Sequence, residues 1–424
     1  MRLAGRGGRM TPRRVVVVGA GMVGLSCAWS LQDYGVEVEV LDKGRVGRGA
    51  SWGNAGYVAP SLTVPLPEPS MLRFGLRAVL DPGSPVRLPV RADTELVRFL
   101  VRLVRHCTGR RWSRAMDGYR MLNAQIFDAF DAQRQAGVDA PLREAAVLAA
   151  FTEAGQAAGL LHELEGVASA GQQIEVGLLT GAQARAMEPN LSREIALAVR
   201  IDGQRYLDPG AYTAALADQV RARNGKITEN VTVTGVDRHA GRVRVRCADG
   251  HRDADAVILA CGAWLPDLAS DHGVRVPQYG GRGYSFTVPL RRRLQGPLYF
   301  PAARAALAPR GASAARVTSI MEFQRPDAPP DRRALAATLR AVRPLLEGAE
   351  WRSVTDPWVG ARPLTADGIP LVGPSATDGV YIAGGHGMWG VTLGPLTGRL
   401  LAEHIATGTT PAPLAWLDPL RKSH

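Results

Sequence analysis

The pattern of apolar positions at the N-terminal end predicts a strand, a helix and a second strand. Residues 15–18 are four consecutive valines, and a short β-branched run of this kind is typical of a buried parallel strand. Residues 25–34 then predict a helix, and Val36, Val38 and Val40 predict the next strand. This order is that of a strand–helix–strand unit with parallel strands.

Helical patterns dominate the next part of the chain. Apolar side chains recur with helical spacing from about residue 96 to residue 170, and residues 179–191 predict a short helix. A further helix is predicted for residues 211–224, with Asp208 as its N-terminal cap and Gly225 as its stop. These helices separate the first α/β unit from a second group of strands.

The remaining part of the chain reads mainly as strands. Short strands are predicted at residues 227–236, 242–247, 256–260 and 380–383. Residues 279–323 are rich in strand patterns, and a helix is predicted near residues 331–346. The chain returns through residues 358–363 and closes with a helix from about residue 395 to residue 407.

Composition describes a globular protein without a membrane span. Apolar residues make up 46% of the 424 residues, and no apolar run approaches the roughly 20 residues that cross a bilayer. Residues 1–12 are basic but lack the apolar core of a signal peptide. These features predict a disordered tail at residues 1–12 and a cytoplasmic location, with peripheral contact on the inner face of the membrane left open.

The net charge of +12 raises the question of an anionic partner. Basic residues are scattered, with local clusters at residues 102–114 and 291–293, whereas nucleic-acid binding needs a basic stripe on a recognisable fold. The sequence therefore predicts no nucleic-acid partner. It favours attraction to anionic lipid headgroups or to an anionic substrate.

The cysteines give no sign of a metal site or a disulfide framework. Cys27, Cys107, Cys247 and Cys261 are far apart and form no Cys-x-x-Cys pair. This spacing predicts buried free thiols in a reducing compartment, and no metal is expected.

A glycine-rich turn follows the first predicted strand. Gly19, Gly21 and Gly24 form a Gly-x-Gly-x-x-Gly pattern that leads directly into the predicted helix. Such a turn directs backbone N–H groups at a pyrophosphate. Asp42, at the end of the second predicted strand, is placed to hold a ribose hydroxyl. The pattern predicts a dinucleotide site, and FAD and NAD are both open at this point.

Further motifs share the order and spacing of one protein family. They are Ser-Trp-Gly-Asn-Ala-Gly at residues 51–56, Ala-Cys-Gly-Ala-Trp at 260–264, Gly-Arg-Gly-Tyr-Ser at 281–285, and the segments 316–323, 358–370 and 384–390. With these motifs the chain resembles the D-amino-acid oxidase-like family of FAD-dependent oxidoreductases. The likeness is strongest to bacterial D-amino-acid dehydrogenases and D-hydroxyproline dehydrogenases, and it spans residues 14–408.

The resemblance implies a mixed α/β fold, in which a Rossmann-like FAD-binding domain is interleaved with a substrate domain built on an antiparallel sheet. A chain of 424 residues exceeds one ordinary core, which agrees with two domains. The expected FAD-binding domain comprises residues 13–75, 180–275 and 355–412. The expected substrate-binding domain comprises residues 76–179 and 276–354.

The resemblance also implies the residues that hold FAD, which is expected to be bound without a covalent link. They come from the glycine turn, the second strand and the later motifs: Gly19, Gly21, Met22, Val23, Gly24, Asp42, Lys43, Ser51, Asn54, Ala55, Gly56, Val231, Cys261, Gly262, Trp264, Gly385, Gly387, Met388, Gly390 and Thr392.

Three residues are candidates for the catalytic site. Arg362, in the Gly-Ala-Arg-Pro turn, takes the position of a carboxylate-binding arginine, and arginine offers a charged bidentate fork. Tyr284 is expected either to add a hydroxyl to the same carboxylate or to be a core tyrosine of the sheet, and the adjacent Arg282 is a weaker candidate. His386 is expected either to form an active-site hydrogen bond or to be held by backbone contacts.

The implied reaction is FAD-dependent oxidative deamination of a D-amino acid or a related secondary amino acid. A hydride passes to flavin N5, and the electrons leave to a quinone or another carrier. Met388 and Trp389 predict a partly apolar wall that suits an aliphatic or cyclic side chain. An oxygen-using oxidase, an FAD-binding subunit of a hetero-oligomeric amino-acid or opine dehydrogenase, and an NAD-only dehydrogenase stay open as alternatives. The amino acid itself is not predicted.

Overall fold

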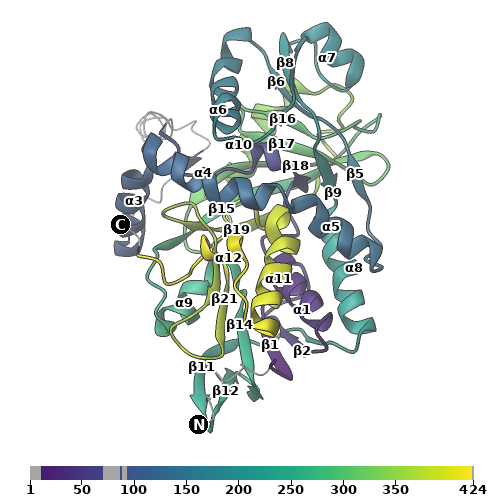
Figure 1. The fold of residues 1–424 in the computed structure, drawn as a ribbon. Helices are drawn as coiled ribbons and strands as arrows, with labels where there is room; N and C mark the ends of the chain where they lie inside the picture. The colour runs from purple at the N-terminus through teal and green to yellow at the C-terminus, as the bar shows by residue number, and fades with distance from the viewer. Residues whose placement is uncertain (1–10, 70–85, 88–92, 423–424) are drawn as a thin grey trace.

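Two large sheets, one above the other in Figure 1, organise the chain. The computed structural model describes residues 11–69, 86–87 and 93–422, so most of the tail predicted for residues 1–12 lies outside the described residues. The lower sheet carries the glycine turn, and the upper sheet carries Arg362.

The lower sheet is parallel apart from one edge strand. Its order is β10-β2-β1-β14-β21-β20, and only β20 runs antiparallel to its neighbour. The bounds are β1 Arg14–Val18, β2 Glu37–Leu41, β10 Lys226–Thr228, β14 Ala256–Leu259, β20 Leu371–Pro374 and β21 Val380–Gly384. Each strand of the predicted first unit is present, because its valines are buried on both faces of the sheet.

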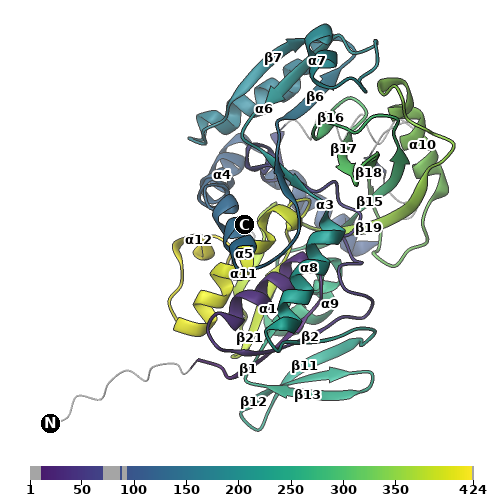
Figure 2. The same ribbon diagram turned by 90° about the vertical axis from the view of Figure 1, so that its right-hand side faces the viewer.

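Helices cover one face of the parallel sheet, and a small sheet covers the other (Figure 2). The helices are α1 Met22–Gln32, α8 Pro209–Ala222 and α11 Gly390–Thr407. Helices α1 and α11 pack closely, since a Cβ at Gly394 or Gly398 would collide with α1. The small antiparallel sheet comprises β11 Val233–His239, β12 Arg242–Cys247 and β13 Gly250–Ala254.

The upper sheet is mostly antiparallel, with the order β19-β15-β18-β17-β16-β6-β8-β7, and β4 pairs with β18. The bounds are β4 Val86–Arg87, β6 Val147–Phe151, β7 Val176–Thr180, β8 Leu197–Ile201, β15 Gln278–Pro289, β16 Leu298–Phe300, β17 Ala305–Arg310, β18 Ala314–Phe323 and β19 Thr355–Thr365. The helices α6 Ala158–Ser169, α7 Gly181–Met187 and α10 Arg332–Val342 belong to this half of the molecule (Figure 1).

The remaining elements are a second small sheet, further helices and short turns. A three-stranded sheet is formed by β3 Tyr57–Val58, β9 Arg205–Leu207 and β5 Leu142–Glu144. The other helices are α3 Thr94–His106, α4 Gly109–Asn123, α5 Ile126–Gln135, α9 Leu265–Ala269 and α12 Ala412–Ala415. Short 3-10 turns lie at Pro60–Leu62, Ala154–Ala157, Gly262–Trp264, Ser270–His272 and Arg343–Leu345.

The sequence prediction failed at several strands, and it placed no strand at β7, β8, β9 or β20. The helical pattern predicted from residue 96 to residue 170 is interrupted by β5 and β6, whose five apolar residues Val147–Phe151 are buried between neighbouring strands. Such a run fits a buried strand or a buried helix equally well. The strand predicted at residues 227–236 is two strands, β10 and β11, in different sheets, and β13 was not predicted.

Other local predictions are confirmed. The Asp208 side chain accepts hydrogen bonds from the N–H groups of Gly210 and Ala211 (2.9 and 3.2 Å) and caps α8. The four cysteines are free thiols, of which Cys27, Cys107 and Cys247 are buried as predicted and Cys261 is only partly buried. Burial raises the pKa of Cys27 to about 12. The mixed α/β class is confirmed as well. Sheet membership places β8 and β19 in the antiparallel sheet, although both fall in segments expected to belong to the FAD-binding domain.

Candidate functional site

A cavity of about 1530 Å³ lies between the two sheets and is lined by residues of both. All but three of the predicted cofactor residues line it. The exceptions are Gly24, Gly56 and Gly385, which do not line the cavity but lie where the backbone requires glycine. A Cβ at Gly24 would collide with the carbonyl of Gly19, and Gly56 and Gly385 have positive φ angles of 81° and 69°.

The glycine turn directs the start of α1 toward this cavity. Gly19 has a φ of 113°, a conformation that suits glycine, and Gly21 is the N-cap of α1 without a side-chain hydrogen bond. The Met22 N–H donates to the Ser51 hydroxyl at 3.1 Å, which joins the turn to the segment 51–56. A helix N-terminus with glycines beside it accommodates an anionic pyrophosphate.

Asp42 is fixed at the rim of the cavity by the backbone. Its two carboxylate oxygens accept hydrogen bonds from the N–H groups of Ala20 (2.7 Å) and Gly44 (2.8 Å). Each carboxylate oxygen has a second lone pair, so the group can also accept ribose hydroxyls. This geometry fits the role expected from the sequence.

A contact between segments of the two sheets lies next to Asp42 in the sequence, at Lys43. The Lys43 ammonium lies 3.5 Å from the centre of the Trp264 ring, and its Nζ is 3.4 Å from the Asp327 carboxylate. The Trp264 indole N–H donates to the other Asp327 oxygen at 2.7 Å. Asp327 follows β18 of the upper sheet, whereas Lys43 and Trp264 follow strands of the lower sheet. Sequence reasoning missed Asp327, because nothing near it marks a long-range partner.

Arg362 lies on β19, so the turn predicted for the Gly-Ala-Arg-Pro segment is wrong: residues 360–363 pair with β15 as a strand. The Arg362 guanidinium lies above a glycine of the neighbouring strand. Gly281 is its partner in register, and a Cβ added to Gly283 would lie 2.5 Å from the Arg362 Cζ. Glycine at position 283 therefore leaves space for the Arg362 guanidinium. Burial lowers the pKa of Arg362 to about 10, so the guanidinium stays charged at neutral pH.

Tyr284 and Arg282 lie on the other face of the upper sheet. Side chains alternate along a strand, so they point away from the face on which Gly283 meets Arg362. The Tyr284 hydroxyl donates to Glu322 at 2.7 Å and accepts from Arg282 at 3.1 Å. Tyr284 also lines the cavity, but its hydroxyl is held in this network, which favours the core interpretation of Tyr284 over the carboxylate interpretation.

His386 is a buried, neutral residue in the closing loop. Its Nε2 is 2.9 Å from the Thr397 hydroxyl, and only 3% of the residue is exposed. Burial lowers the pKa of His386 to about 4. His386 therefore adds no charge to the site near neutral pH.

The same loop continues into the cavity wall. Met388 lines the cavity, and the adjacent Trp389 donates its indole N–H to the carbonyl of Val64 at 2.7 Å.

Several further polar residues line the cavity and were not predicted, and four of them form a charged and hydroxyl-bearing group. Glu68, Glu163, Tyr299 and Arg304 come from separate segments of the chain, so no local motif could have marked them. Burial raises the pKa of Glu163, while Arg304 and a hydrogen bond with Glu68 act in the opposite direction. This part of the wall is polar, in contrast to the apolar side chain of Met388.

Trp358 fills a slot made by two glycines. A Cβ at Gly53 or Gly360 would collide with the Trp358 ring. Trp358 lines the cavity, as does Arg362 on the same strand. Trp52 stacks at a tilt against Trp358, with ring centres 6.3 Å apart. The segment 51–56 therefore contacts β19 directly.

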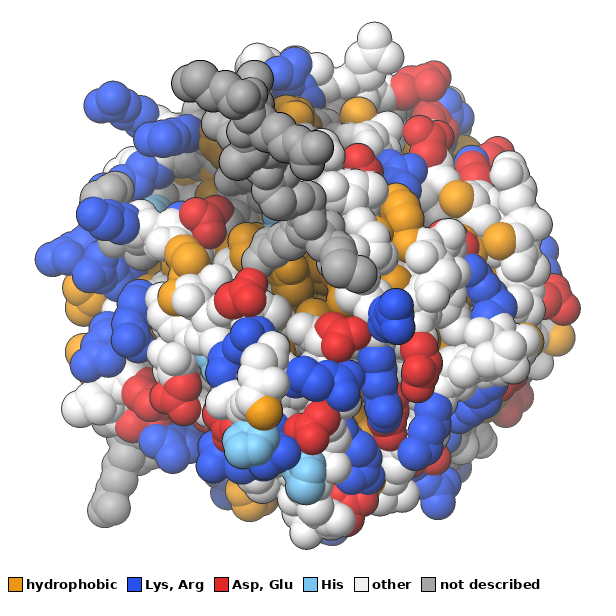
Figure 3. All heavy atoms as spheres, turned by 60° about the horizontal axis from the view of Figure 1, so that its bottom comes forward, with side chains coloured by type: hydrophobic (Ala, Val, Ile, Leu, Met, Phe, Trp, Pro, Cys, Tyr) orange, Lys and Arg blue, Asp and Glu red, His pale blue; other side chains and the backbone are white. Residues whose placement is uncertain are grey.

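Three further features of the molecule concern metal-ligating side chains, surface charge and membrane-spanning helices. No group of His, Cys, Asp and Glu side chains within the described ranges could hold a metal ion. Figure 3 shows basic and acidic side chains intermixed on the face that lies at the bottom of Figure 1. In the part of the chain that the structure describes, no helix is long and apolar enough to cross a bilayer.

Comparison with known proteins gives the same family as the motifs. Residues 14–404 match the family described as FAD dependent oxidoreductase (DAO). A D-amino acid dehydrogenase of Rhizorhabdus wittichii is 30% identical over 416 residues, which cover 94% of this chain and 97% of the relative. A D-amino acid dehydrogenase of Cereibacter sphaeroides is 31% identical over 407 residues, with 92% and 91% covered.

Solved structures share the fold at lower identity. Glycine oxidase from Geobacillus kaustophilus has a TM-score of 0.73 at 22% identity, with 97% of this chain and 99% of that chain covered. L-Proline dehydrogenase from P. horikoshii has a TM-score of 0.70 at 18% identity, with 97% and 98% covered. These likenesses show the architecture of the two sheets and the chain connections between them.

Proposed function

The chain belongs to the FAD dependent oxidoreductase family, and we propose that it oxidises the α-carbon of a D-amino acid or a related secondary amino acid. One observation carries the proposal: the glycine turn of α1 and the charged Arg362 line the same cavity. A dinucleotide and a carboxylate can therefore be bound side by side. The names of the relatives support an amino acid as the substrate.

The walls of the cavity fit FAD. Small residues at positions 19, 21, 53, 55 and 262 let the backbone approach a ligand closely. Asp42 and the start of α1 would hold the adenosine and pyrophosphate parts, without a covalent bond. When bound, FAD supplies the oxidation by taking a hydride from the substrate carbon. The N-terminus of α11, with Gly390 and Thr392 in the wall, favours negative charge beside it.

Arg362 performs the binding step. Its guanidinium can donate two parallel hydrogen bonds to the substrate carboxylate, which fixes the α-carbon in one orientation. Its positive charge in a desolvated site also disfavours a second cation nearby, so the bound amine loses its proton more easily than in water. Neutral His386 adds no opposing charge. The chain thus prepares the free amine from which a carbon-bound hydride leaves most readily.

We propose that the electrons pass to a quinone or another carrier, not to oxygen. A quinone dissolved in the bilayer would bring the protein to the inner face of the membrane as a peripheral protein. The apolar contribution of Met388 to the wall suits an aliphatic or cyclic side chain. The polar residues Glu163 and Arg304 line the same cavity.

Anaerobic titration of the purified yellow protein tests this function. A panel of D- and L-amino acids, with glycine and sarcosine, is added while flavin absorbance is followed. Bleaching by D-amino acids without any partner protein is expected, and turnover should need an artificial acceptor. Full-rate peroxide production in air would instead identify an oxidase. Failure to bleach with every amino acid would reject the proposal and favour a subunit that needs a partner.

A further inference from the structure

Helix α3 carries an exposed apolar stripe that the proposed chemistry does not use. Val97, Val101 and Val104 are 50%, 47% and 52% exposed. Their spacing of four and three residues places them within an arc of about 60° on one helix face. Seven large apolar residues are exposed among the described residues, and three of them form this stripe.

The stripe is not the face by which α3 is attached to the protein. Leu96, Phe99 and Leu103 are buried on the opposite side, where they pack against Tyr279 and Phe323 of the upper sheet. The helix thus has two apolar faces, and the one that faces the core is already packed against other side chains. An exposed apolar stripe on an otherwise anchored helix indicates an interaction surface.

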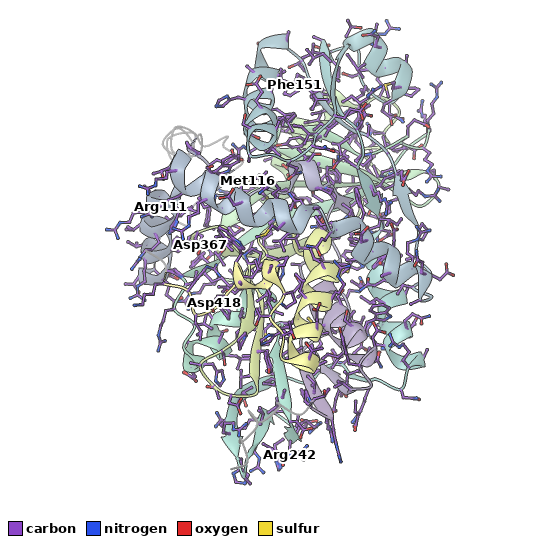
Figure 4. All side chains as sticks on the ribbon, viewed as in Figure 1. Arg111, Met116, Phe151, Arg242, Asp367 and Asp418 are labelled. Atoms are coloured by element: carbon purple, nitrogen blue, oxygen red, sulfur yellow. The ribbon has the colours of Figure 1, made fainter. Side chains whose placement is uncertain are left out.

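Arginines lie along one side of the stripe. Arg98 and Arg105 lie about a quarter turn from the valines on α3, and the next helix, α4, begins with the exposed pair Arg110 and Arg111. Figure 4 labels Arg111 at the outer edge of the molecule, beside α3. The acidic residue of the helix, Glu95, is in its first turn. The surface therefore combines apolar and positive character.

We propose that α3 and the start of α4 dock on the surface of an anionic lipid bilayer. The valines would enter the headgroup region, and the arginines would pair with lipid phosphates. A second copy of this chain fits less well, because a two-fold interface would bring the same arginines face to face. The proposal does not depend on which amino acid is oxidised.

Vesicle flotation of the holoenzyme tests the proposal. Vesicles of equal parts phosphatidylglycerol and phosphatidylcholine should bind the protein at low salt, whereas pure phosphatidylcholine should not. Each basic residue near an anionic surface contributes roughly a fivefold factor in partitioning. The double variant R98E/R105E should therefore bind roughly 25-fold more weakly or worse. The variant V101D should lose binding as well.

Matched controls separate this surface from nonspecific attraction. Leu178 is 59% exposed on β7, and Arg193 and Arg292 are exposed elsewhere, so L178D and R193E/R292E should bind like the unchanged protein. All variants should keep their FAD and their activity with a soluble dye. This readout also separates a failure here from a failure of the proposed oxidation.

Two kinds of result would overturn the proposal. One is a failure of the vesicle assay itself, either as equal binding of V101D and L178D to the anionic vesicles or as no binding by the unchanged protein. The other is a concentration-dependent dimer that V101D abolishes while vesicle binding is absent, which would assign the valine stripe to a second copy of the chain.

Discussion

Arg421, near the C-terminus, is joined to Asp367 by two hydrogen bonds of 2.8 and 3.0 Å. Asp367 lies in the turn that follows β19, and the Arg421 side chain also donates to the carbonyls of Ile369 and Pro370. Figure 4 labels Asp367 together with Asp418 of the C-terminal segment. The end of the chain therefore holds the turn that follows the strand of Arg362.

Replacement of Arg421 should destabilise the protein. The side chains of Arg421 and Asp367 are only 15% and 7% exposed, so Arg421→Ala leaves a buried carboxylate without its cation. Breaking such a pair costs about 3–5 kcal/mol. Chemical denaturation should show this loss, and the exposed neighbour Lys422 provides the control Lys422→Ala, for which no change is expected. Equal stability of the two variants would contradict the role of Arg421.

The same pair predicts a loss of stability in acid. Burial alone would raise the pKa of Asp367, but Arg421 and the N–H of Ile369 hold it below the usual value. Since the folded pKa lies below the unfolded one, the stabilisation is complete at neutral pH and is lost as pH falls below about 4. Denaturation over a pH series should give a shallower acid slope for Arg421→Ala than for the unchanged protein. Parallel slopes would show that Arg421 does not set this titration.

Removal of the Arg362 guanidinium should weaken substrate binding specifically. A charged hydrogen bond to a carboxylate is worth about 1.5–3 kcal/mol, so Arg362→Ala should raise KM roughly ten- to a hundredfold while FAD stays bound. Arg362→Lys should recover part of the loss, because it keeps the charge but not the fork. Steady-state kinetics and the flavin spectrum give both readouts. Unchanged kinetics in Arg362→Ala would exclude it as the carboxylate anchor.

The lack of a side chain at Gly283 should be needed for substrate binding, because the Arg362 guanidinium occupies the space where a Cβ would lie. A Cβ there would press against the Arg362 guanidinium, so Gly283→Ala should raise KM in the same direction as Arg362→Ala, with FAD still bound. Gly177 on β7 is the matched control, since a Cβ there would meet only the Arg200 side chain at 3.8 Å. Gly177→Ala should leave KM unchanged. An equal rise in both variants would point to a general effect on the sheet.

His386 should not govern the pH dependence of the reaction. Burial lowers its pKa to about 4, so the ring stays neutral across the ordinary assay range. The variant His386→Gln keeps a polar group near Thr397 and should retain the shape of the profile of kcat/KM against pH. Loss in the variant of an acid limb near pH 6.5 would show that the ring does titrate in the active protein.

The sequence predicted the fold correctly where a local pattern is compatible with only one type of structure. The valines of β1, the glycine turn and the Asp208 cap each combine sequence and geometry within a few residues. The pattern failed at Val147–Phe151, where a short apolar run became a strand because β8 and β16 flank it. That choice depends on partners far away in the sequence.

The same distinction separates the parts of the site. The family motifs indicated Arg362 because it stands in a recognisable Gly-Ala-Arg-Pro segment, although that segment is part of strand β19 and not the turn that was predicted. The hydroxyl of Tyr284 could not be placed from the sequence, since its direction depends on strand alternation and on Glu322. Asp327 and Glu163 were missed for the same reason, because the contact of Asp327 with Trp264 and the place of Glu163 in the cavity wall depend on the packing of separate elements.

The cavity has a consequence for the lifetime of the protein. Its walls combine residues near both ends of the chain, including Gly19, Arg362 and Thr392, so a bound FAD acts as a non-covalent cross-link between them. Free FAD at a thousand times its dissociation constant would add about 4 kcal/mol to the free energy of unfolding. A cell short of riboflavin would therefore lose this protein to proteolysis, and cofactor supply would set its abundance as well as its activity.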